Sequence, residues 1–278
     1  MLEWLSRAFE SAFDRPLQTA EQLSAATHML SSLEYLGSRA DRAPGGLNDW
    51  SHTRTQIPTK SRALQTVRDV VAREPMTQAL HASRVVAAAA LIVPVTGNKT
   101  RLLANAYLAA SQLVLYPRHF FGTDGSDQVS FLVQSAAALG RLGGTDNSRT
   151  AAVQFIGAQT VLSYGASGWA KLPGSAWRSG DALAKIMRTR TYGDENVFRM
   201  LDRFPAGSRL VCHIVLALEC GFPLLLLHKG RYIDAGLVIM GSFHLINARF
   251  MGLSRFVWAF TSTYPAVRAL AKGTAAAA

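Results

Sequence analysis

Lys171 is the residue whose type and position most favour chemistry. It closes an apolar run that ends Ser-Gly-Trp-Ala-Lys-Leu, and Trp177 follows a few residues later. A lysine that is partly withdrawn from water can give up its proton and act as a general base. The alternative is structural, because a lysine at a helix end commonly extends its ammonium group to the membrane interface beside a tryptophan. The sequence leaves both interpretations open.

A second group of polar residues lies inside two later apolar runs. His244 and Asn247 are three residues apart, so they share a face of a helix. Glu219 stands in the middle of the preceding run, where an ionised side chain is costly unless it is paired. With the lysine, these residues could form a catalytic pocket. Equally, Arg249 or Arg255 could neutralise Glu219 in a buried cluster that only fixes helix packing.

Other chemical templates are missing from the sequence. It contains no HExxH, CxxC, P-loop or dinucleotide-binding glycine pattern. The acidic residues around Asp124 lack the spacing of a calcium-binding loop. Cys212 and Cys220 lie on one predicted helix and are too far apart to form a disulfide. We therefore predict no metal site and no redox-active cysteine pair.

These residues lie on apolar runs that we predict to be helices. Hydrophobic residues make up 49% of the 278 residues and charged residues only 17%, whereas soluble domains carry roughly 25% charged residues. A spanning helix needs about 20 mostly apolar residues, and small or polar interruptions suit contacts between helices. The sequence therefore predicts an all-α, polytopic transmembrane helical bundle with about six spans, within a range of roughly five to eight. The runs are 83–97, 102–116, 129–142, 151–172, 210–227 and 233–260.

We divide the chain into three parts. Residues 1–76 form a polar N-terminal segment with amphipathic helices, residues 77–268 form the transmembrane domain, and residues 269–278 form a disordered tail. Residues 1–15 show the spacing of an amphipathic helix rather than the apolar core of a signal peptide, so we expect internal segments to direct membrane insertion.

Within the N-terminal segment, residues 20–36 have helical spacing but carry Glu21, His28 and Glu34, which makes this stretch a poor spanning helix. Residues 43–59 contain several glycines and prolines and are predicted to be a loop, whereas 61–74 is predicted to be an exposed amphipathic helix.

The chain carries a formal net charge of +11. Its lysines and arginines mostly separate the apolar runs instead of clustering with aromatic residues on a polar domain, which argues against nucleic-acid binding. Basic pairs in the short loops after the first, third and fifth runs indicate a cytoplasmic face. On that basis the long connection 173–208 faces outward, although its own arginines argue mildly for the opposite orientation.

Three ordered motifs resemble a known family. The run 164–172, followed by Trp177 and Gly180, is similar to the Gly-x-x-Lys-Leu…Trp…Gly signature of HTTM-type membrane proteins, the superfamily of vitamin K-dependent gamma-carboxylase. The stretch that begins at Glu219 resembles the following helix of that family. The pattern from Phe243 to Phe250, Phe-His-x-x-Asn-x-x-Phe, resembles its Phe-His helix. Together the motifs cover roughly residues 80 to 265.

This resemblance implies a site and a cofactor class. Lys171 would be the base that deprotonates a reduced, vitamin K-like quinone, and His244 would be a second catalytic group. Residues 121–127 resemble the loop before the family's third span. Polar groups of the pocket would come from Glu219, Asn247, Trp177, Asp124 and Asp127.

The resemblance also implies a location and partners. The chain is similar in size to short bacterial members of the SdpB-like type, which act in peptide-toxin maturation. It implies an integral protein of the bacterial plasma membrane that contacts the lipid bilayer and acts on a peptide substrate or with a partner membrane protein. The alternatives are a non-catalytic membrane partner in peptide-toxin maturation or a redox complex, and a soluble helical protein with a basic DNA-binding surface.

Overall fold

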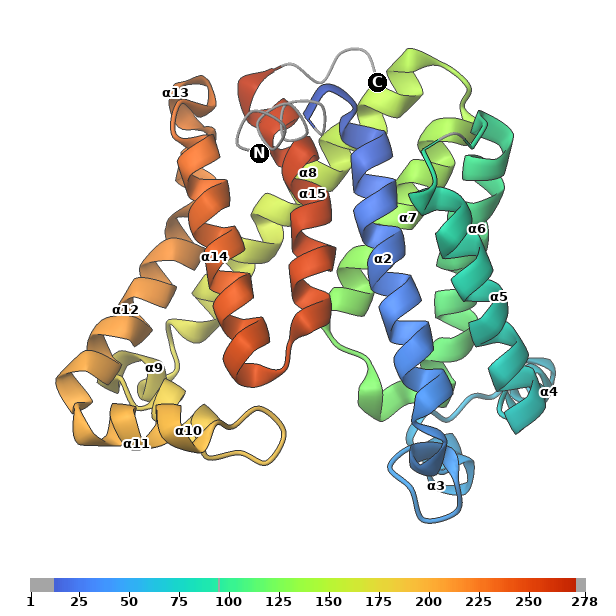
Figure 1. Ribbon diagram of the computed structural model, residues 1–278, viewed down its shortest axis with the longest axis horizontal. Coiled ribbons are helices and arrows are strands. Elements are labelled where there is room, and N and C mark those ends of the chain that lie inside the picture. Colours follow the sequence, from blue (N-terminus) through green and yellow to red (C-terminus); the bar gives the residue numbers. More distant parts are fainter. Residues whose placement is uncertain (1–12, 95, 274–278) are drawn as a thin grey trace. The chain divides into compact units, whose positions relative to one another are not determined.

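Every regular element of the protein is a helix in the residues that the computed structural model describes, 13–94 and 96–273 (Figure 1). The all-α prediction is therefore confirmed. Most of the predicted amphipathic stretch 1–15, and residues 274–278 of the predicted tail, lie outside the described residues. The chain divides into two compact units. The N-terminal unit is Leu17–Ala152, and the C-terminal unit is Val153–Ala278 together with Met1–Pro16.

The N-terminal unit is built on long helices that pack through small residues. Its inner contacts join Ala25 of α2 to Ala88 and Leu91 of α5 and to Ala104 and Leu108 of α6. Small side chains allow helix backbones to approach closely and leave room for polar side chains beside them. The helices are α2 (Pro16–Gly37), η1 (Arg39–Arg42), α3 (Trp50–Gln56), α4 (Arg62–Val71), α5 (Glu74–Ile92), α6 (Asn98–Leu115), η2 (Tyr116–Gly122) and α7 (Gly125–Leu142).

The predicted helices 20–36 and 61–74 correspond to α2 and α4. The predicted loop 43–59 is wrong in part, because it contains α3, whose first turn is capped by the Asp49 carboxylate accepting from the amide of Ser51. The predicted domain boundary at 76/77 falls inside the N-terminal unit. The reason is that the polar side chains of α2 are not surface groups: they are buried against α5, α6 and α7.

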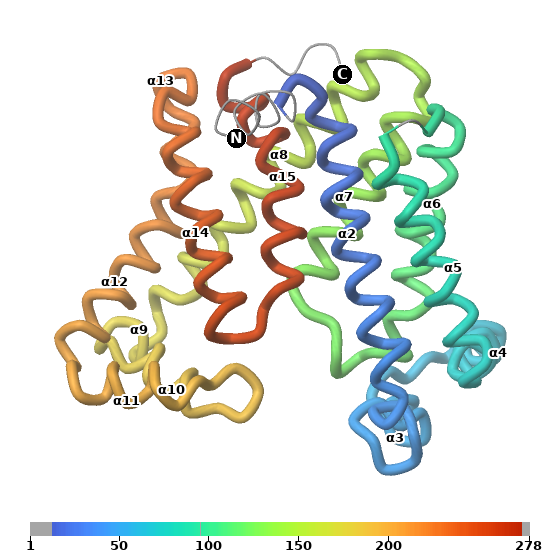
Figure 2. Tube along the Cα trace, viewed as in Figure 1, coloured from blue at the N-terminus to red at the C-terminus, as the bar shows by residue number. Residues whose placement is uncertain are grey.

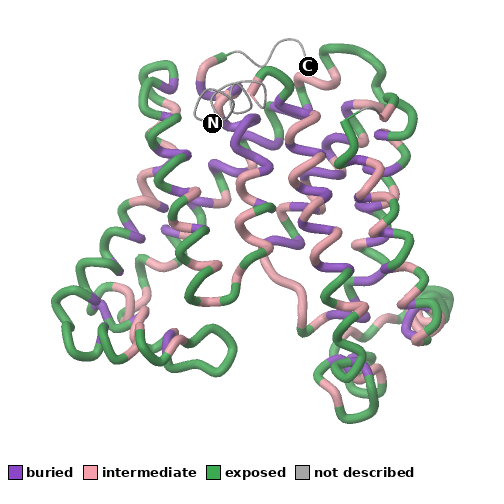
Figure 3. Tube along the Cα trace, in the orientation of Figure 1, coloured by how far each residue is buried: buried purple, intermediate pink, exposed green. Residues whose placement is uncertain are grey.

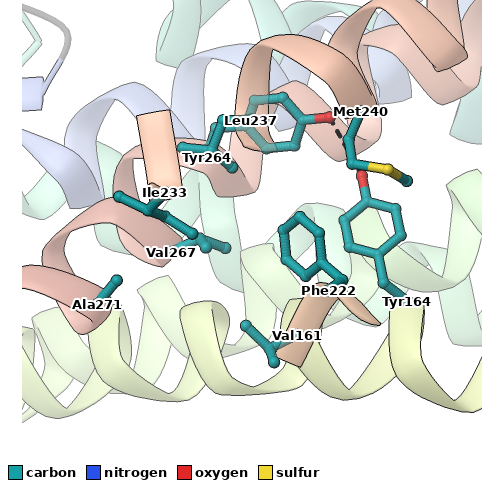
Figure 4. Packing of buried hydrophobic residues seen from close by; sticks show 9 residues of the cluster. All are labelled: Val161, Tyr164, Phe222, Ile233, Leu237, Met240, Tyr264, Val267 and Ala271. Carbon is teal, nitrogen blue, oxygen red and sulfur yellow. Dashed lines mark hydrogen bonds between the residues drawn. The ribbon is translucent and has the colours of Figure 1, made fainter. Parts of the chain in front are cut away.

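The C-terminal unit has a more apolar core. Figure 4 shows Tyr164, Phe222, Met240 and Tyr264 gathered in one cluster with smaller aliphatic residues. Helices α14 and α15 run side by side along it (Figure 2). The helices are the greater part of α8 (Asp146–Lys171), then α9 (Ser175–Ser179), α10 (Ala182–Met187), α11 (Glu195–Arg203), α12 (Pro205–Gly221), η3 (Phe222–Leu226), α13 (Leu227–Gly230), α14 (Ile233–Met251) and α15 (Ser254–Lys272).

Three predictions of element boundaries change in this unit. The run 233–260 is two helices, because Gly252 ends α14 in a left-handed conformation (φ +71°) that favours glycine. The run 210–227 is α12 followed by a 3-10 turn at Phe222-Pro223. The predicted tail from 269 begins too early, since α15 continues to Lys272 with Ala269 and Ala271 buried.

The long connection 173–208 is helical rather than open. Helices α9, α10 and α11 lie at one end of α12 in Figure 1. Gly180 (φ +88°) brings the connection against α12, where a Cβ would lie 2.4 Å from the Cα of Arg209. The backbone oxygen of Gly180 accepts a hydrogen bond from the hydroxyl of Ser208 at 2.7 Å. Figure 3 shows that α9 and α11 are mostly exposed, whereas most of α10 is buried or partly buried.

Among the described residues, one stretch, Pro205–Gly230, is long and apolar enough to span a membrane by length and composition alone. This is weak support by itself, because a core helix of a soluble protein can pass the same test. Only 28% of its most apolar window is buried. The exposure of individual apolar side chains elsewhere in the molecule says more about a membrane environment. Large apolar side chains such as Val86, Leu103 and Val238 are more than 60% exposed.

Candidate functional site

Lys171 and Glu219 form the centre of the candidate site, in the C-terminal unit. The lysine Nζ donates hydrogen bonds to Glu219 Oε2 and to the hydroxyl of Ser167, each at 2.6 Å. It also lies 5.5 Å from the centre of the Trp177 ring, a cation–π contact. The Lys171 side chain is 24% exposed and that of Glu219 only 6%. The structure therefore brings together Lys171, Glu219 and Trp177.

A glycine makes this ion pair possible. At Gly168, one turn before the lysine, a Cβ would lie 2.6 Å from the backbone nitrogen of Cys220 and 2.9 Å from the Cβ of Glu219. Helices α8 and α12 therefore touch backbone to backbone at this point. Gly165 has a similar role one turn earlier, where a Cβ would lie 3.0 Å from the ring of Pro223. The glycines of the Lys171 motif thus set the helix spacing that places Glu219 beside the lysine.

His244 belongs to a separate hydrogen-bonded group. Its Nε2 lies 2.8 Å from the hydroxyl of Tyr164, which lies 3.2 Å from the hydroxyl of Tyr264. Figure 4 shows the two tyrosine hydroxyls meeting in the apolar cluster. The imidazole stacks on Phe260 with 4.4 Å between ring centres. Within the described part of the chain, the buried Nδ1 of His244 has no hydrogen-bond partner.

The remaining predicted residues have different surroundings. Asn247 is half-buried one turn beyond His244. Asp124 and Asp127 form the capping box of α7: Asp124 accepts from the backbone amide of Ser126 at 2.8 Å, and Asp127 accepts from the backbone amide of Asp124 at 3.1 Å. Both aspartates belong to the N-terminal unit, whereas Lys171 belongs to the C-terminal unit. Asp127 also lines an open cavity of the N-terminal unit.

Arg249, one of the two predicted alternative partners of Glu219, has different surroundings. Arg249 lies over the ring of Phe250, 5.3 Å from its centre, and is exposed. The positive partner of Glu219 is Lys171 itself. The sequence did not identify this pair because the two partners stand 48 positions apart, and helical periodicity does not tell which helix packs on which.

A large polar core in the N-terminal unit was not predicted as a site. Glu21 is fully buried and accepts from Arg101 at 3.1 Å, from Asn105 at 3.0 Å and from both Nε and a terminal nitrogen of Arg141, the latter at 2.8 Å. Two guanidinium groups therefore share one carboxylate. The feature of the sequence that could have indicated this polar core is Glu21, whose charge was interpreted only as an obstacle to membrane insertion.

Arg84 is the centre of a second buried polar cluster in the same unit. It is 1% exposed, and each of its three nitrogens has a hydrogen-bond acceptor. The acceptors are Ser32, Ser111, His28, Gln112 and the backbone oxygen of Leu108. Helices α2, α5 and α6 are thus tied together through one arginine. Within the described residues, no cluster of three or more His, Cys, Asp or Glu residues is arranged to hold a metal ion.

Comparison of the chain with known protein families, with characterised proteins and with solved structures finds no match.

Proposed function

We propose that this chain is a polytopic integral membrane protein. The observation that supports the proposal is an inverted distribution of side chains. The most deeply buried residues of the N-terminal unit include Glu21, His28, Arg84 and Gln134, while many large apolar residues of the same helices are exposed. A protein folded in water tends to have the opposite arrangement, and a bilayer favours an apolar exterior around a satisfied polar interior.

Helix lengths agree with this proposal. Helices α5, α6, α7, α14 and α15 have 18 or 19 residues, and α8 has 26, close to the roughly 20 residues that a bilayer core requires. The polar side chains that lower the hydropathy of α2 and α5 face protein partners rather than the exterior. Charged residues at membrane depth are tolerated when they pair inside the bundle.

The test of membrane insertion is extraction. After expression in a bacterium, we expect the chain in the membrane fraction, resistant to alkaline carbonate and released by detergent. Recovery of monodisperse protein from the soluble fraction without detergent would contradict the proposal. Of the two native cysteines, Cys212 is buried and Cys220 is half-buried. Single cysteines added to the loops can therefore report on which side of the membrane each loop lies.

We further propose that Lys171 is the base of a reduced-quinone or peptide-modifying reaction of the carboxylase-related type. The supporting observation is that its ammonium group is partly exposed while its counter-ion is buried. The 2.6 Å hydrogen bond from Nζ to Glu219 Oε2 gives the lysine a directly bonded carboxylate as a proton acceptor. As a neutral amine, a lysine can take the proton of a phenolic hydroxyl, since alkylamines and phenols have similar intrinsic pKa values of about 10.

His244 has a different role in this proposal. Its hydrogen bond goes to Tyr164, seven residues before Lys171 on the same face of α8. The aromatic group around it fixes α8 against α14 and α15 and thereby holds the helix that carries Lys171. His244 is therefore a positioning residue rather than a catalytic one.

The experiment measures saturable binding of a reduced naphthoquinone, and its oxidation by dissolved oxygen as the electron acceptor, with the purified protein in nanodiscs. We expect both to be lost in Lys171→Met and Glu219→Gln, and to persist in His213→Gln, whose side chain lies at the surface against the backbone oxygen of Arg178. His244→Gln should weaken binding without abolishing it.

A non-catalytic membrane partner is the second candidate. It is favoured by the hydrogen bonds that Lys171, Ser167 and Glu219 make with one another, because a purely structural contact also requires its polar groups to be paired. The same experiment separates the two candidates. A well-folded native protein that neither binds nor oxidises the naphthoquinone would leave the partner role and overturn the role of Lys171 as a base.

A further inference from the structure

The N-terminal unit contains an open cavity where α6 and η2 meet α7. Helices α6 and α7 pack side by side in this unit (Figure 1). The cavity has a volume of about 240 Å³, and apolar atoms make up most of its wall, including those of Leu113 and Phe131. Sites for drug-sized ligands have volumes of roughly 300–1,000 Å³. This cavity therefore suits a smaller and mainly apolar ligand.

Gln112 of α6 lines this cavity, and Arg84 determines how its side-chain amide is oriented. The amide Oε1 accepts a hydrogen bond from a terminal nitrogen of Arg84 at 2.8 Å. Because a guanidinium has donors and no acceptor, the amide atom that faces it must be the oxygen. Arg84 is 1% exposed and also donates to Ser32 and Ser111, so the amide is held by a group that is itself fixed.

The amide nitrogen of Gln112 is left for the open cavity. Arg84 lines a smaller inner cavity, whereas Gln112 lines both the inner and the open one. Its Oε1 is engaged on the inner side by Arg84. Within residues 13–94 and 96–273, its Nε2 makes no hydrogen bond and is not enclosed. The open cavity thus combines an apolar wall with a hydrogen-bond donor of fixed orientation.

The charges near the cavity favour a neutral ligand. Arg84 lines the inner cavity and Asp127 lines the open one, so an anion would meet the carboxylate and a cation would approach the guanidinium. Both groups already have partners in the protein: Arg84 donates to several acceptors, and Asp127 accepts from the backbone amide of Asp124 at 3.1 Å. Neither charge requires a ligand of opposite sign.

We propose that this cavity binds a small neutral carbonyl compound. The carbonyl oxygen accepts a hydrogen bond from Nε2 of Gln112, and the apolar body lies along Leu113 and Phe131. A carbonyl oxygen accepts without donating, which matches an amide nitrogen that donates without accepting. The carbonyl of a free ketone and the ester carbonyl of a bilayer lipid share this chemistry. The site goes beyond the function proposed above, since it lies in the N-terminal unit and does not use Lys171.

The test uses acetophenone as the probe and α-methylstyrene as its matched control, in which a methylene group replaces the carbonyl oxygen. The full chain is placed in nanodiscs of ether-linked phosphatidylcholine, which contain no ester carbonyl. NMR of the Leu113 methyl groups follows occupancy, and the infrared carbonyl band of acetophenone reports its hydrogen bond. We expect saturable binding of acetophenone with its band shifted to lower frequency, and binding of α-methylstyrene about tenfold weaker.

Two variants separate the donor from the apolar wall. Gln112→Glu retains an acceptor for Arg84 and nearly the same shape, but replaces the donor by a second acceptor. It should abolish the preference for acetophenone and favour 1-phenylethanol, whose hydroxyl donates to the new acceptor. Phe131→Ala removes part of the wall and should weaken acetophenone and α-methylstyrene by the same factor. His213→Gln, at the surface of the C-terminal unit, should change neither affinity. Thermal unfolding checks that each variant is folded.

Nanodiscs of ester-linked phosphatidylcholine identify the source of the carbonyl. A lower affinity for acetophenone than in the ether-linked nanodiscs would show that a lipid ester carbonyl competes for Gln112. An unchanged affinity would assign the cavity to a free ketone. Both results agree with a carbonyl site.

Three results would overturn the proposal. The first is equal affinity for acetophenone and α-methylstyrene in the native protein. The second is a preference for acetophenone that Gln112→Glu leaves unchanged. The third is the absence of any saturable change at Leu113 in a folded protein, which would show that the cavity holds only solvent or lipid chains.

Discussion

The two compact units use buried charge in opposite ways. In the N-terminal unit, Glu21 is fully buried, and Arg101 and Arg141, which bond it, are almost as inaccessible. In the C-terminal unit the charged pair is Lys171 with Glu219, and the lysine reaches the surface. The first arrangement is enclosed and the second is open on one side.

This difference separates structural from chemical roles. A buried ion cluster contributes little net stability compared with apolar packing, but removing one member is strongly destabilising because the others remain charged and unpaired. Glu21 therefore fixes which helices meet. A lysine with one exposed side can also exchange a proton with a substrate, and Lys171 has that exposure.

The largest expected effect is at Glu21. Glu21→Gln keeps the shape but leaves two buried guanidinium groups without a counter-charge, so we expect the free energy of unfolding to fall by about 3–5 kcal/mol. Unfolding in mixed micelles, followed by tryptophan fluorescence and by yield of monodisperse protein, measures this loss.

The matched control for Glu21 is Glu195→Gln. Glu195 is also paired with an arginine, Arg199, but both side chains are at least 70% exposed, and exposed pairs contribute little. Equal destabilisation by the two substitutions would show that the enclosed cluster is not the structural centre of the N-terminal unit.

The second expected effect tests whether the open pair is more than structural. Lys171→Met leaves the buried carboxylate of Glu219 without its partner and should destabilise the protein by about 2–3 kcal/mol. Lys171→Met combined with Glu219→Leu should recover most of that loss, and a double-mutant cycle measures the coupling.

Recovery of stability without recovery of naphthoquinone oxidation would separate the chemical role of the pair from its packing role. If the double variant is destabilised by the full sum of the two single losses, the two residues do not stabilise each other, and the comparison of the units fails.

Periodicity alone predicted much of the fold and less of the sites. The spacing of apolar residues located α2, α4 and most of the long helices, because a helix records its buried face in its own sequence. It did not find the break at Gly252, since a single glycine inside an apolar run is compatible with either a continued or an ended helix.

Pairing between helices is what the sequence could not supply. Glu21 and His28 were interpreted as barriers to insertion, although their partners lie on α5, α6 and α7. The lysine of the candidate site was predicted, but not that its partner is Glu219. The partners of Glu21 and of Lys171 were not predicted for the same reason. A polar residue in an apolar run indicates that it has a partner, but not where in the chain that partner lies.

The third expected effect concerns the contact that brings the open pair together. In Gly168→Ala the new methyl group would lie 2.6 Å from the backbone of Cys220, so α8 and α12 must separate. We expect a loss of about 2 kcal/mol, together with reduced naphthoquinone binding because the distance from Lys171 to Glu219 grows.

Gly221→Ala is the control for Gly168→Ala. Gly221 lies at the end of α12 with no atom within 4 Å of its would-be Cβ, and the substitution should be neutral or slightly stabilising. If Gly168→Ala is equally harmless, close packing of α8 on α12 is not what positions the pair.

The smallest expected effect lies at Glu74, the first residue of α5, before the apolar run of that helix. Its ion pair with Arg42 is half-exposed, intermediate between the enclosed cluster of Glu21 and the open pair of Lys171. Arg42 donates to both carboxylate oxygens of Glu74, at 3.0 Å and 2.7 Å. The hydrogen bonds from Arg42 lower the pKa of Glu74 from 4.5 to about 2. Ionised Glu74 therefore contributes stability that is fully present above pH 4.5 and is lost as the pH falls toward 2.

Because the Glu74 side chain is 38% exposed, solvent screening limits this contribution to about 1 kcal/mol. Glu74→Gln should lower the free energy of unfolding by that amount at pH 7, and the difference from the native protein should vanish near pH 2. Asp146→Asn, which removes a more exposed carboxylate paired with Arg149, should show no such pH dependence. If the stability difference between Glu74→Gln and the native protein stays constant from pH 7 to pH 2, the carboxylate contributes by its shape rather than by its charge. The pair of Arg42 and Glu74 would then be a packing contact, and it would not be an intermediate between the enclosed and the open ion pairs.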